Sequence, residues 1–161
     1  MTTVAGYVDG RATPITVVDI GGGKLLRTDA ASAFQAMRAA AQRDGYPLVV
    51  ASAWRSNEQQ QALRQAYLEG RGNLAAEPGY SNHQGGISLD IEVRRSYTDP
   101  TYLWLKQNAG RFGFVNDVAG EPWHWTYTSS FLPRSPVFLA GATIAAVAGI
   151  GFAVWAIRRR R

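Results

Sequence analysis

Apolar and polar residues alternate in two stretches of the chain with the period of two that is typical of a half-buried strand. In the first stretch, residues 87–93, Asp90 and its polar neighbours point away from the intervening apolar side chains. In the second, residues 121–127, His124 lies on the face opposite the aromatic side chains. We therefore predict two strands that each carry a candidate metal ligand on the face turned away from the core layer.

Shorter apolar runs predict the other strands. One is Ile15–Ile20, and another lies at residues 112–115. Pro47–Ala53 is rich in valine and bounded by turn residues, so we predict an interior strand there. Gly21–Gly23 lacks the ordered spacing and the Lys-Ser/Thr pair of a phosphate-binding loop, which favours a flexible turn.

Apolar stripes and end signals predict three helices. The signals are Thr28 as the cap of a helix over 29–43, Ser56–Gln59 as the capping box of a helix that stops at Gly70, and Asp99–Pro100 at the start of a helix that ends near Gly110. The expected inward-facing residues are Phe34, Met37 and Ala41 in the first helix and Leu63 and Tyr67 in the second. We read these stripes as core.

These elements predict an α+β fold in which helices flank a small antiparallel sheet. The two alternating strands would present their polar side chains to one groove on that sheet. A chain of 161 residues allows one domain of ordinary size, able to bury a core. We place this domain at residues 1–135.

The candidate chemistry centres on the histidines. The chain has two histidines and no cysteine, so a tetrahedral zinc site must use nitrogen and oxygen ligands. His83 precedes Gly85-Gly86, which lets the backbone bend so that the imidazole swings toward the Asp90 face. With His124, two imidazoles and one carboxylate leave a fourth position for water, as in catalytic zinc sites. The alternative for either histidine alone is an ordinary core or surface residue.

The same residues form two motifs, His-x-x-Gly-x-Ser-x-Asp from His83 to Asp90 and Glu-Pro-Trp-His from Glu121 to His124. Together they closely resemble the zinc D-alanyl-D-alanine carboxypeptidase family, which includes vancomycin-resistance carboxypeptidases and phage L-alanyl-D-glutamate endopeptidases. The resemblance runs from about residue 34 to residue 127. It implies zinc on His83, Asp90 and His124, with Glu121 as the general base.

The resemblance also bears on residues outside these motifs. Trp54-Arg55-Ser56 matches an Arg-Ser pair that usually follows a strand in this family, which favours a substrate or oxyanion contact for Arg55 over a plain surface cation. Ser81 and Gln60 are further candidates for substrate contacts, with loop and helix-surface roles as the alternatives. Ser88 stands where the family usually has Ala, and its hydroxyl could alter the hydrogen bonds behind the ligands.

The C-terminal part has a different character. From Val137 to Ile157 about twenty-one residues carry no charge, long enough to cross a hydrocarbon core of roughly 30 Å at about 1.5 Å per residue. We predict a transmembrane helix at residues 136–157, with a buried soluble helix as the alternative. The basic tail at 158–161 favours the cytoplasmic or internal side, which would put the peptidase domain outside. Small residues that could let two such helices self-associate are Gly141, Ala145 and Gly149.

The formal net charge of +5 does not indicate a nucleic-acid partner. Four of the positive charges belong to Arg158–Arg161, and residues 1–136 carry a net charge of only about +1. The basicity is therefore a property of the tail.

These observations give a leading hypothesis of a membrane-anchored zinc peptidase that cleaves the D-amino-acid-containing stem peptides of bacterial peptidoglycan. Carboxypeptidase and endopeptidase activities both stay open. A catalytically idle anchor or wall-binding structural protein is the alternative from another class.

The location is a separate question. Residues 1–27 lack a basic segment followed by an apolar core of the signal-peptide type. One hypothesis is a viral protein, either a phage lysin or a component of a membrane-containing virion. A bacterial protein inserted through its C-terminal helix is the alternative.

Overall fold

The computed structural model describes residues 1–128, which form two antiparallel sheets, three α-helices and one 3₁₀-helix. The first sheet has the order β1-β2-β3 and the second β4-β5-β7-β6. The strands are β1 Thr2–Val8, β2 Arg11–Asp19, β3 Leu25–Arg27, β4 Val50–Ser52, β5 Ser88–Ile91, β6 Phe114–Val115 and β7 His124–Tyr127. The helices are α1 Thr28–Arg43, α2 Asn57–Leu68, α3 Pro100–Asn108 and the 3₁₀-helix η1 Ala109–Phe112.

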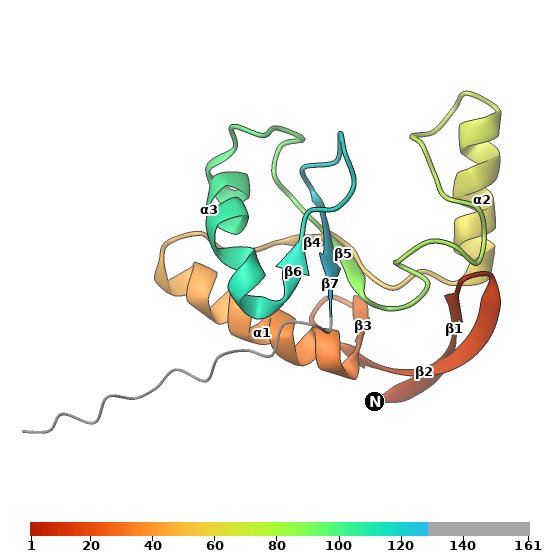
Figure 1. Ribbon diagram of the computed structural model, residues 1–161, viewed down its shortest axis with the longest axis horizontal. Coiled ribbons are helices and arrows are strands. Elements are labelled where there is room, and N and C mark those ends of the chain that lie inside the picture. Colours follow the sequence, from red (N-terminus) through yellow and green to blue (C-terminus); the bar gives the residue numbers. More distant parts are fainter. Residues whose placement is uncertain (129–161) are drawn as a thin grey trace, which may run out of the picture.

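The helices are arranged around the four-stranded sheet. In Figure 1, α1 runs along one side of this sheet, whereas α2 and α3 stand at its two ends. The expected α+β architecture with antiparallel strands is therefore confirmed. The three-stranded sheet was only partly foreseen, because just Ile15–Ile20 was predicted as a strand in this region.

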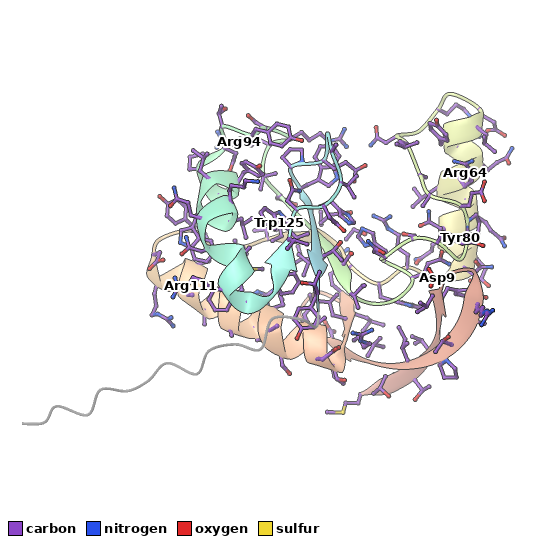
Figure 2. All side chains as sticks on the ribbon, viewed as in Figure 1. Asp9, Arg64, Tyr80, Arg94, Arg111 and Trp125 are labelled. Carbon is purple, nitrogen blue, oxygen red and sulfur yellow. The ribbon has the colours of Figure 1, made fainter. Side chains whose placement is uncertain are left out.

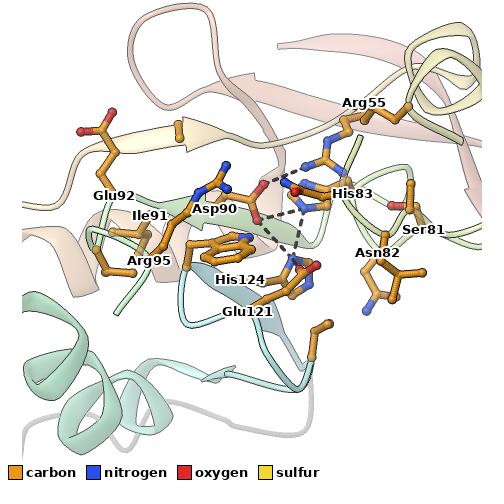
Figure 3. A pocket seen from close by; sticks show the side chains of 18 of the residues that line it. Arg55, Ser81, Asn82, His83, Asp90, Ile91, Glu92, Arg95, Glu121 and His124 are labelled. Carbon is orange, nitrogen blue, oxygen red and sulfur yellow. Dashed lines mark hydrogen bonds and ion pairs between the residues drawn. The ribbon is translucent and has the colours of Figure 1, made fainter. Parts of the chain in front are cut away.

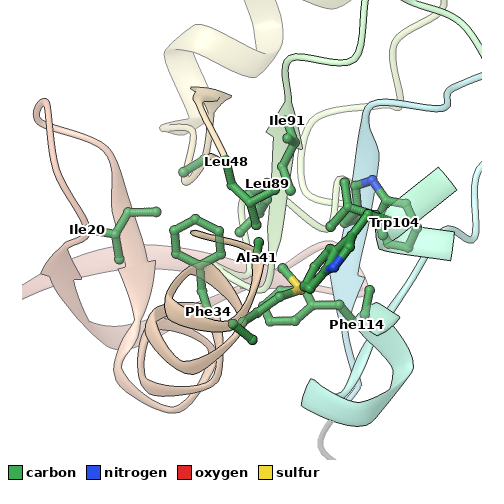
Figure 4. Packing of buried hydrophobic residues seen from close by; sticks show 14 of the residues in the cluster. Ile20, Phe34, Ala41, Leu48, Leu89, Ile91, Trp104 and Phe114 are labelled. Atoms are coloured by element: carbon green, nitrogen blue, oxygen red, sulfur yellow. The ribbon is translucent and has the colours of Figure 1, made fainter. Parts of the chain in front are cut away.

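The main core forms between α1 and the four-stranded sheet. The predicted stripe of α1 is confirmed, since Phe34, Met37 and Ala41 are fully buried. On the sheet, Leu89 and Ile91 of β5 are also fully buried, as alternation with period two requires. Figure 4 shows α1 residues and sheet residues meeting in this layer. One face of β5 is thus fixed in the core, which leaves the other face for the polar residues.

Two of the predicted helix starts are confirmed. Ser56 accepts a hydrogen bond from the Gln59 backbone N–H, and the Gln59 side chain returns one, which completes the capping box of α2. Asp99 caps α3 by accepting from the Thr101 N–H at 2.8 Å. The prediction of Thr28 as a cap was wrong. Because β3 leads directly into α1, Thr28 is already helical and no side chain caps that helix.

The predicted inward face of α2 was also wrong. Leu63 is 43% exposed and Tyr67 is half-buried, while Gln60 is the only buried residue of the helix. The reason is the placement of α2 beyond the end of the sheet, where it packs on the loop over residues 71–77 instead of on the core.

The segment at 47–53 is not an interior strand. Only Val50–Ser52 pairs, antiparallel to β5 with an irregular register, and this strand β4 lies at the edge of its sheet. Just after it, the Trp54 N–H donates to the Leu25 carbonyl at 2.8 Å. The end of β4 therefore connects the two sheets.

A hairpin of β1 and β2 supports the loop that precedes β5. The Tyr7 N–H donates to the Gln84 carbonyl at 3.1 Å, and the Gly10 N–H donates to the Gly79 carbonyl at 3.0 Å. Figure 2 shows Asp9 at the hairpin tip beside Tyr80. Gln84 is fully buried, and its side chain accepts from the Gly79 N–H at 2.7 Å. The loop at 79–86 is therefore held by the hairpin and by a hydrogen bond within the loop itself.

The predicted transmembrane helix at 136–157 and the basic tail at 158–161 lie outside the described residues. None of the helices within residues 1–128 combines the length and the apolar composition that a bilayer crossing needs.

Gly79→Ala tests the close contact between the hairpin and the loop. Gly79 has φ +94°, and a Cβ there would lie 2.9 Å from the Gly10 Cα, a backbone atom that cannot rotate away. We expect the free energy of unfolding to fall by about 2 kcal/mol or more, measured by urea titration.

Gly23→Ala is the matched control. Gly23 also has a positive φ, +71°, but a Cβ there would meet no atom within 4 Å. Gly23→Ala should lower the free energy of unfolding by only about 1 kcal/mol, the penalty of the left-handed backbone itself. Equal losses in the two variants would show that the hairpin does not press on the loop.

Candidate metal centre

The pairing of β5 with β7 brings two polar side chains together. In this antiparallel register Asp90 lies opposite His124, and Ser88 lies opposite Thr126. Directly paired residues on one face of a sheet have Cβ atoms about 5 Å apart. Two residues 34 positions apart in the sequence therefore become neighbours through the sheet alone.

The third side chain comes from the loop before β5. His83 and Gly86 form a turn in which the Gly86 N–H donates to the His83 carbonyl at 3.1 Å. The turn places the His83 imidazole beside the Asp90 carboxylate, as predicted from the glycine pair. Figure 3 shows the three side chains converging from the loop and the two strands.

The distances within this group fit a tetrahedral metal. His83 Nε2 lies 3.2 Å from His124 Nδ1 and 3.3 Å from Asp90 Oδ1, and His124 Nδ1 lies 3.2 Å from the same oxygen. Ligands about 2.1 Å from a tetrahedral zinc ion are separated by roughly 3.4 Å. The three atoms therefore match one face of a zinc coordination tetrahedron, and the fourth corner is left for water or substrate.

The outer nitrogen of each imidazole is fixed by a hydrogen bond. His83 Nδ1 lies 2.7 Å from the Ala53 carbonyl, which can only accept, so this nitrogen carries the proton. His124 Nε2 lies 3.1 Å from Thr126 Oγ1, whose own hydrogen goes to Asp117 Oδ1 at 2.9 Å. His124 Nε2 must therefore be the donor. In the neutral form, each histidine therefore turns an unprotonated nitrogen toward Asp90, which is the state a metal ligand requires.

Electrostatics favours the same protonation states. Burial lowers the pKa of His83, which keeps the imidazole neutral. Burial by itself would raise the pKa of the Asp90 carboxyl, but the positively charged Arg55 guanidinium, which donates to Asp90 Oδ2 at 2.7 Å, holds it below its usual range. Asp90 is thus an ionised oxygen donor beside the neutral His83 imidazole.

Glu121 lies next to this group without belonging to it. Its Oε2 is 3.9 Å from His124 Nδ1, and the side chain is partly exposed to the groove. Burial raises the pKa of Glu121, with the nearby Asp90 charge acting in the same direction and His124 and Arg55 opposing it. A carboxylate in this position can accept and return a proton beside the metal.

Arg55 contacts the metal group directly. One terminal nitrogen donates to Asp90 Oδ2 at 2.7 Å, and Nε donates to Ser52 Oγ at 3.1 Å. The sequence suggested a contact with substrate. The structure places Arg55 in the same groove but with its closest partner on a ligand carboxylate, a contact that the sequence could not reveal.

The remaining predicted residues line the groove. Ser81 and Gln60 belong to the same cavity of about 1230 Å³ as the metal group. Gln60 is buried: its Nε2 donates to the Ala76 carbonyl at 2.9 Å, while its Oε1 has no hydrogen-bond partner within residues 1–128. A buried oxygen without a donor is an available acceptor for a ligand N–H.

Sequence reasoning missed the support behind His124. Thr126 and Asp117 form a chain of hydrogen bonds to His124 Nε2, and Ser88 Oγ lies 2.8 Å from Thr126 Oγ1. Thr126 stands two residues after His124, on the same face of a predicted strand. This spacing was the one available signal, since Asp117 is brought near only by the tertiary fold.

Thr126→Val tests this support. Valine keeps the volume of threonine but removes the acceptor that orients His124, so we expect affinity for zinc to fall by about 10- to 100-fold in a chelator competition assay.

Thr128→Val is the matched control, because the Thr128 hydroxyl donates to the Gly113 carbonyl, away from the metal group. An unchanged affinity in Thr126→Val, or an equal loss in both variants, would contradict an orienting role for Thr126.

Comparison with known proteins places this geometry in context. The family model described as VanY, D-alanyl-D-alanine carboxypeptidase, matches residues 23–130. A D-alanyl-D-alanine carboxypeptidase of Enterococcus faecalis is 32% identical over 114 residues, which is 55% of this chain and 42% of that protein. One of Enterococcus faecium is 30% identical over 101 residues, 55% of this chain and 32% of that protein. The chain thus spans less than half the length of these curated relatives.

Solved structures give the same result. A mutant of the vancomycin-resistance D,D-pentapeptidase VanY in complex with Zn(II) matches with a TM-score of 0.58 and 28% identity, over 70% of this chain and 78% of that one. The LD-carboxypeptidase LdcB matches with a TM-score of 0.62 and 25% identity, over 80% of this chain and 73% of that one.

Proposed function

The chain belongs to the VanY D-alanyl-D-alanine carboxypeptidase family, and from this premise we propose that it is a zinc-dependent carboxypeptidase acting on the stem peptides of bacterial peptidoglycan. The observation that carries the proposal is the triangle of His83, Asp90 and His124, whose donor atoms are spaced for tetrahedral zinc. The Zn(II) complex of the related VanY structure supports the choice of metal.

In the proposed reaction the three ligands would hold zinc against the sheet. When bound, zinc supplies Lewis-acid polarisation of a carbonyl and lowers the pKa of water toward about 7. Glu121 takes a proton as the water oxygen forms its bond to the scissile carbonyl carbon. It then delivers that proton to the amine as the C–N bond breaks, so a single residue acts as base and acid. Its position 3.9 Å from a ligand nitrogen supports this role.

Three other residues would position the substrate. Arg55 stabilises the ionised form of Asp90 and lies where its remaining N–H groups can meet a substrate oxygen. Gln60 offers its unpartnered Oε1 to a peptide N–H, and Ser81 offers a hydroxyl from the loop that carries His83.

A catalytically idle wall-binding protein is the competing function. The ligand tautomers and the placement of Glu121 support catalysis, since a scaffold that only binds the wall needs neither. Mass spectrometry of muropeptides after incubation with the zinc-loaded protein separates the two functions. It also identifies the bond that is cut, and thereby a carboxypeptidase or an endopeptidase.

Glu121→Gln should lower kcat by about 10²- to 10⁴-fold, because the amide can neither take nor return a proton. Zinc content should stay at one per chain, since Glu121 is not a member of the ligand triangle. Metal analysis and stem-peptide hydrolysis measure the two effects.

Glu77→Gln makes the same chemical change at a side chain that is 68% exposed, and it should keep wild-type turnover. Loss of zinc in Glu121→Gln would make Glu121 a ligand, and full activity would refute its role as the base.

We propose further that residues 137–157 anchor the enzyme in a membrane with the peptidase domain outside. We also propose that this segment can self-associate. The support is the uncharged sequence of this segment and the basic residues that follow it. A virion membrane is the proposed location, and detection of the protein in purified virions tests it.

Truncation after Ser135 tests the division into a domain and an anchor. Every proposed site residue lies within residues 1–128, and no helix there could span a bilayer, so the fragment should bind one zinc and cleave soluble muropeptides like the full chain. It should no longer sediment with membrane vesicles. A folded, zinc-loaded but inactive fragment would refute the division, and a fragment that still sediments would show a second membrane contact.

A further inference from the structure

The groove continues past the metal group to a turn that follows β5. Arg94 and Arg95 occupy this turn with φ values of 46° and 51°. Two consecutive non-glycine residues in the left-handed region cost about 1–2 kcal/mol each, so the surrounding structure must hold this turn in place. Both residues line the same cavity as the metal group.

Four arginines line this cavity, and they differ in their partners. Three of them have a carboxylate within reach: Arg55 pairs with Asp90 at 2.7 Å, Arg64 with Glu77 at 3.5 Å and Arg94 with Asp99 at 3.9 Å. Within residues 1–128, Arg95 has no carboxylate within 4.0 Å. Glu92 and Glu121 line the cavity too, yet neither forms an ion pair with it. The Arg95 guanidinium is therefore the cation of this groove that is available to an incoming anion.

Arg95 is exposed, and one contact orients its side chain. Its guanidinium carbon lies 5.2 Å from the centre of the Trp123 ring, a cation–π contact. Within residues 1–128 the Arg95 guanidinium donates no hydrogen bond, so its N–H groups are free to bind a planar anion such as a carboxylate.

The platform under Arg95 is tied to the metal centre. Trp123 directly precedes the ligand His124, and its carbonyl accepts from the Ile91 N–H at 2.8 Å, one residue after the ligand Asp90. In the view of Figure 3, the Arg95 side chain extends toward the part of the groove where Asp90 lies. A carboxylate bound by Arg95 would thus lie in the same groove as the metal group.

We propose that Arg95, in cation–π contact with Trp123, forms a subsite for a carboxylate of the substrate. This proposal rests on the proposed function, because a stem peptide supplies the anion. Two sources share this chemistry: the C-terminal carboxylate of the peptide and the free α-carboxylate of its γ-linked D-glutamate.

The test uses three synthetic stem peptides that end in D-Ala-D-Ala. The first carries both carboxylates, the second has a carboxamide on the D-glutamate, and the third has a carboxamide at the C-terminus. Each is assayed for kcat/KM with the zinc-loaded full-length wild type and with Arg95→Ala, Arg95→Lys and Arg94→Ala. Zinc content and thermal stability are measured for every variant.

We expect Arg95→Ala to lower kcat/KM by about tenfold or more on the peptide with both carboxylates. One of the two carboxamide peptides lacks the carboxylate that Arg95 recognises. On that peptide, the loss of kcat/KM in Arg95→Ala should stay within about threefold. That peptide identifies the source of the carboxylate. Arg95→Lys should recover part of the wild-type preference for the peptide with both carboxylates, because lysine keeps the charge but not the planar fork.

Arg94→Ala is the matched control, since it removes the same charge from the same turn but from a guanidinium that faces Asp99. Arg94→Ala should keep the wild-type preference for the peptide with both carboxylates. A loss of kcat/KM in Arg94→Ala as large as that in Arg95→Ala would overturn the subsite. A loss in Arg95→Ala that is equal on all three peptides would overturn it too. If wild type cleaves none of the peptides, the proposed function itself fails, and the subsite fails with it.

Discussion

A buried carboxylate is the constraint on which the rest of this structure depends. Asp90 is 8% exposed and ionised, and an isolated charge at such a position would cost several kcal/mol. Arg55 offsets part of this cost by donating to Asp90 Oδ2 at 2.7 Å, and a cation shared with the His83 and His124 nitrogens that face Oδ1 would offset the rest. The three partners come from a loop, a strand and the end of another strand. The fold must therefore bring separate segments to one point to keep Asp90 charged.

The supporting elements can be understood from that requirement. β5 is fixed by the burial of Leu89 and Ile91, and its pairing with β7 places His124 opposite Asp90. The hairpin of β1 and β2 holds the loop at 79–86, and with it His83. The whole of this hairpin precedes residue 23, where the match to the family begins. The chain thus uses its own N-terminal segment to position a residue of the family motif.

The groove combines this rigid centre with a polar surface that can recognise a peptide. Gln60 offers a buried acceptor on the α2 side, while Arg95, beside Trp123, has no ion-pair partner within residues 1–128. Arg55 differs from both, because its closest contact is with the Asp90 carboxylate. Arg55 therefore compensates for the charge of Asp90 beside its proposed substrate contact, whereas Arg95 is proposed for substrate recognition alone.

The sequence by itself determined the parts of the protein that depend on local pattern. Alternation over 87–93 defined β5 and the face of Asp90, the capping box at Ser56 defined the start of α2, and the two motifs identified the candidate ligands. Each of these signals is carried by neighbouring residues, whose spacing is fixed by the geometry of a strand or a helix turn.

Only the tertiary structure decided what depends on long-range placement. Leu63 was expected inside, but α2 stands beyond the sheet, and β4 is an edge strand because, among residues 1–128, only β5 pairs with it. The links from Arg55 to Asp90 and from Asp117 through Thr126 to His124 join segments that no local spacing relates. Periodicity specifies which face of an element is apolar, whereas the partner of a polar side chain is set by how the elements pack.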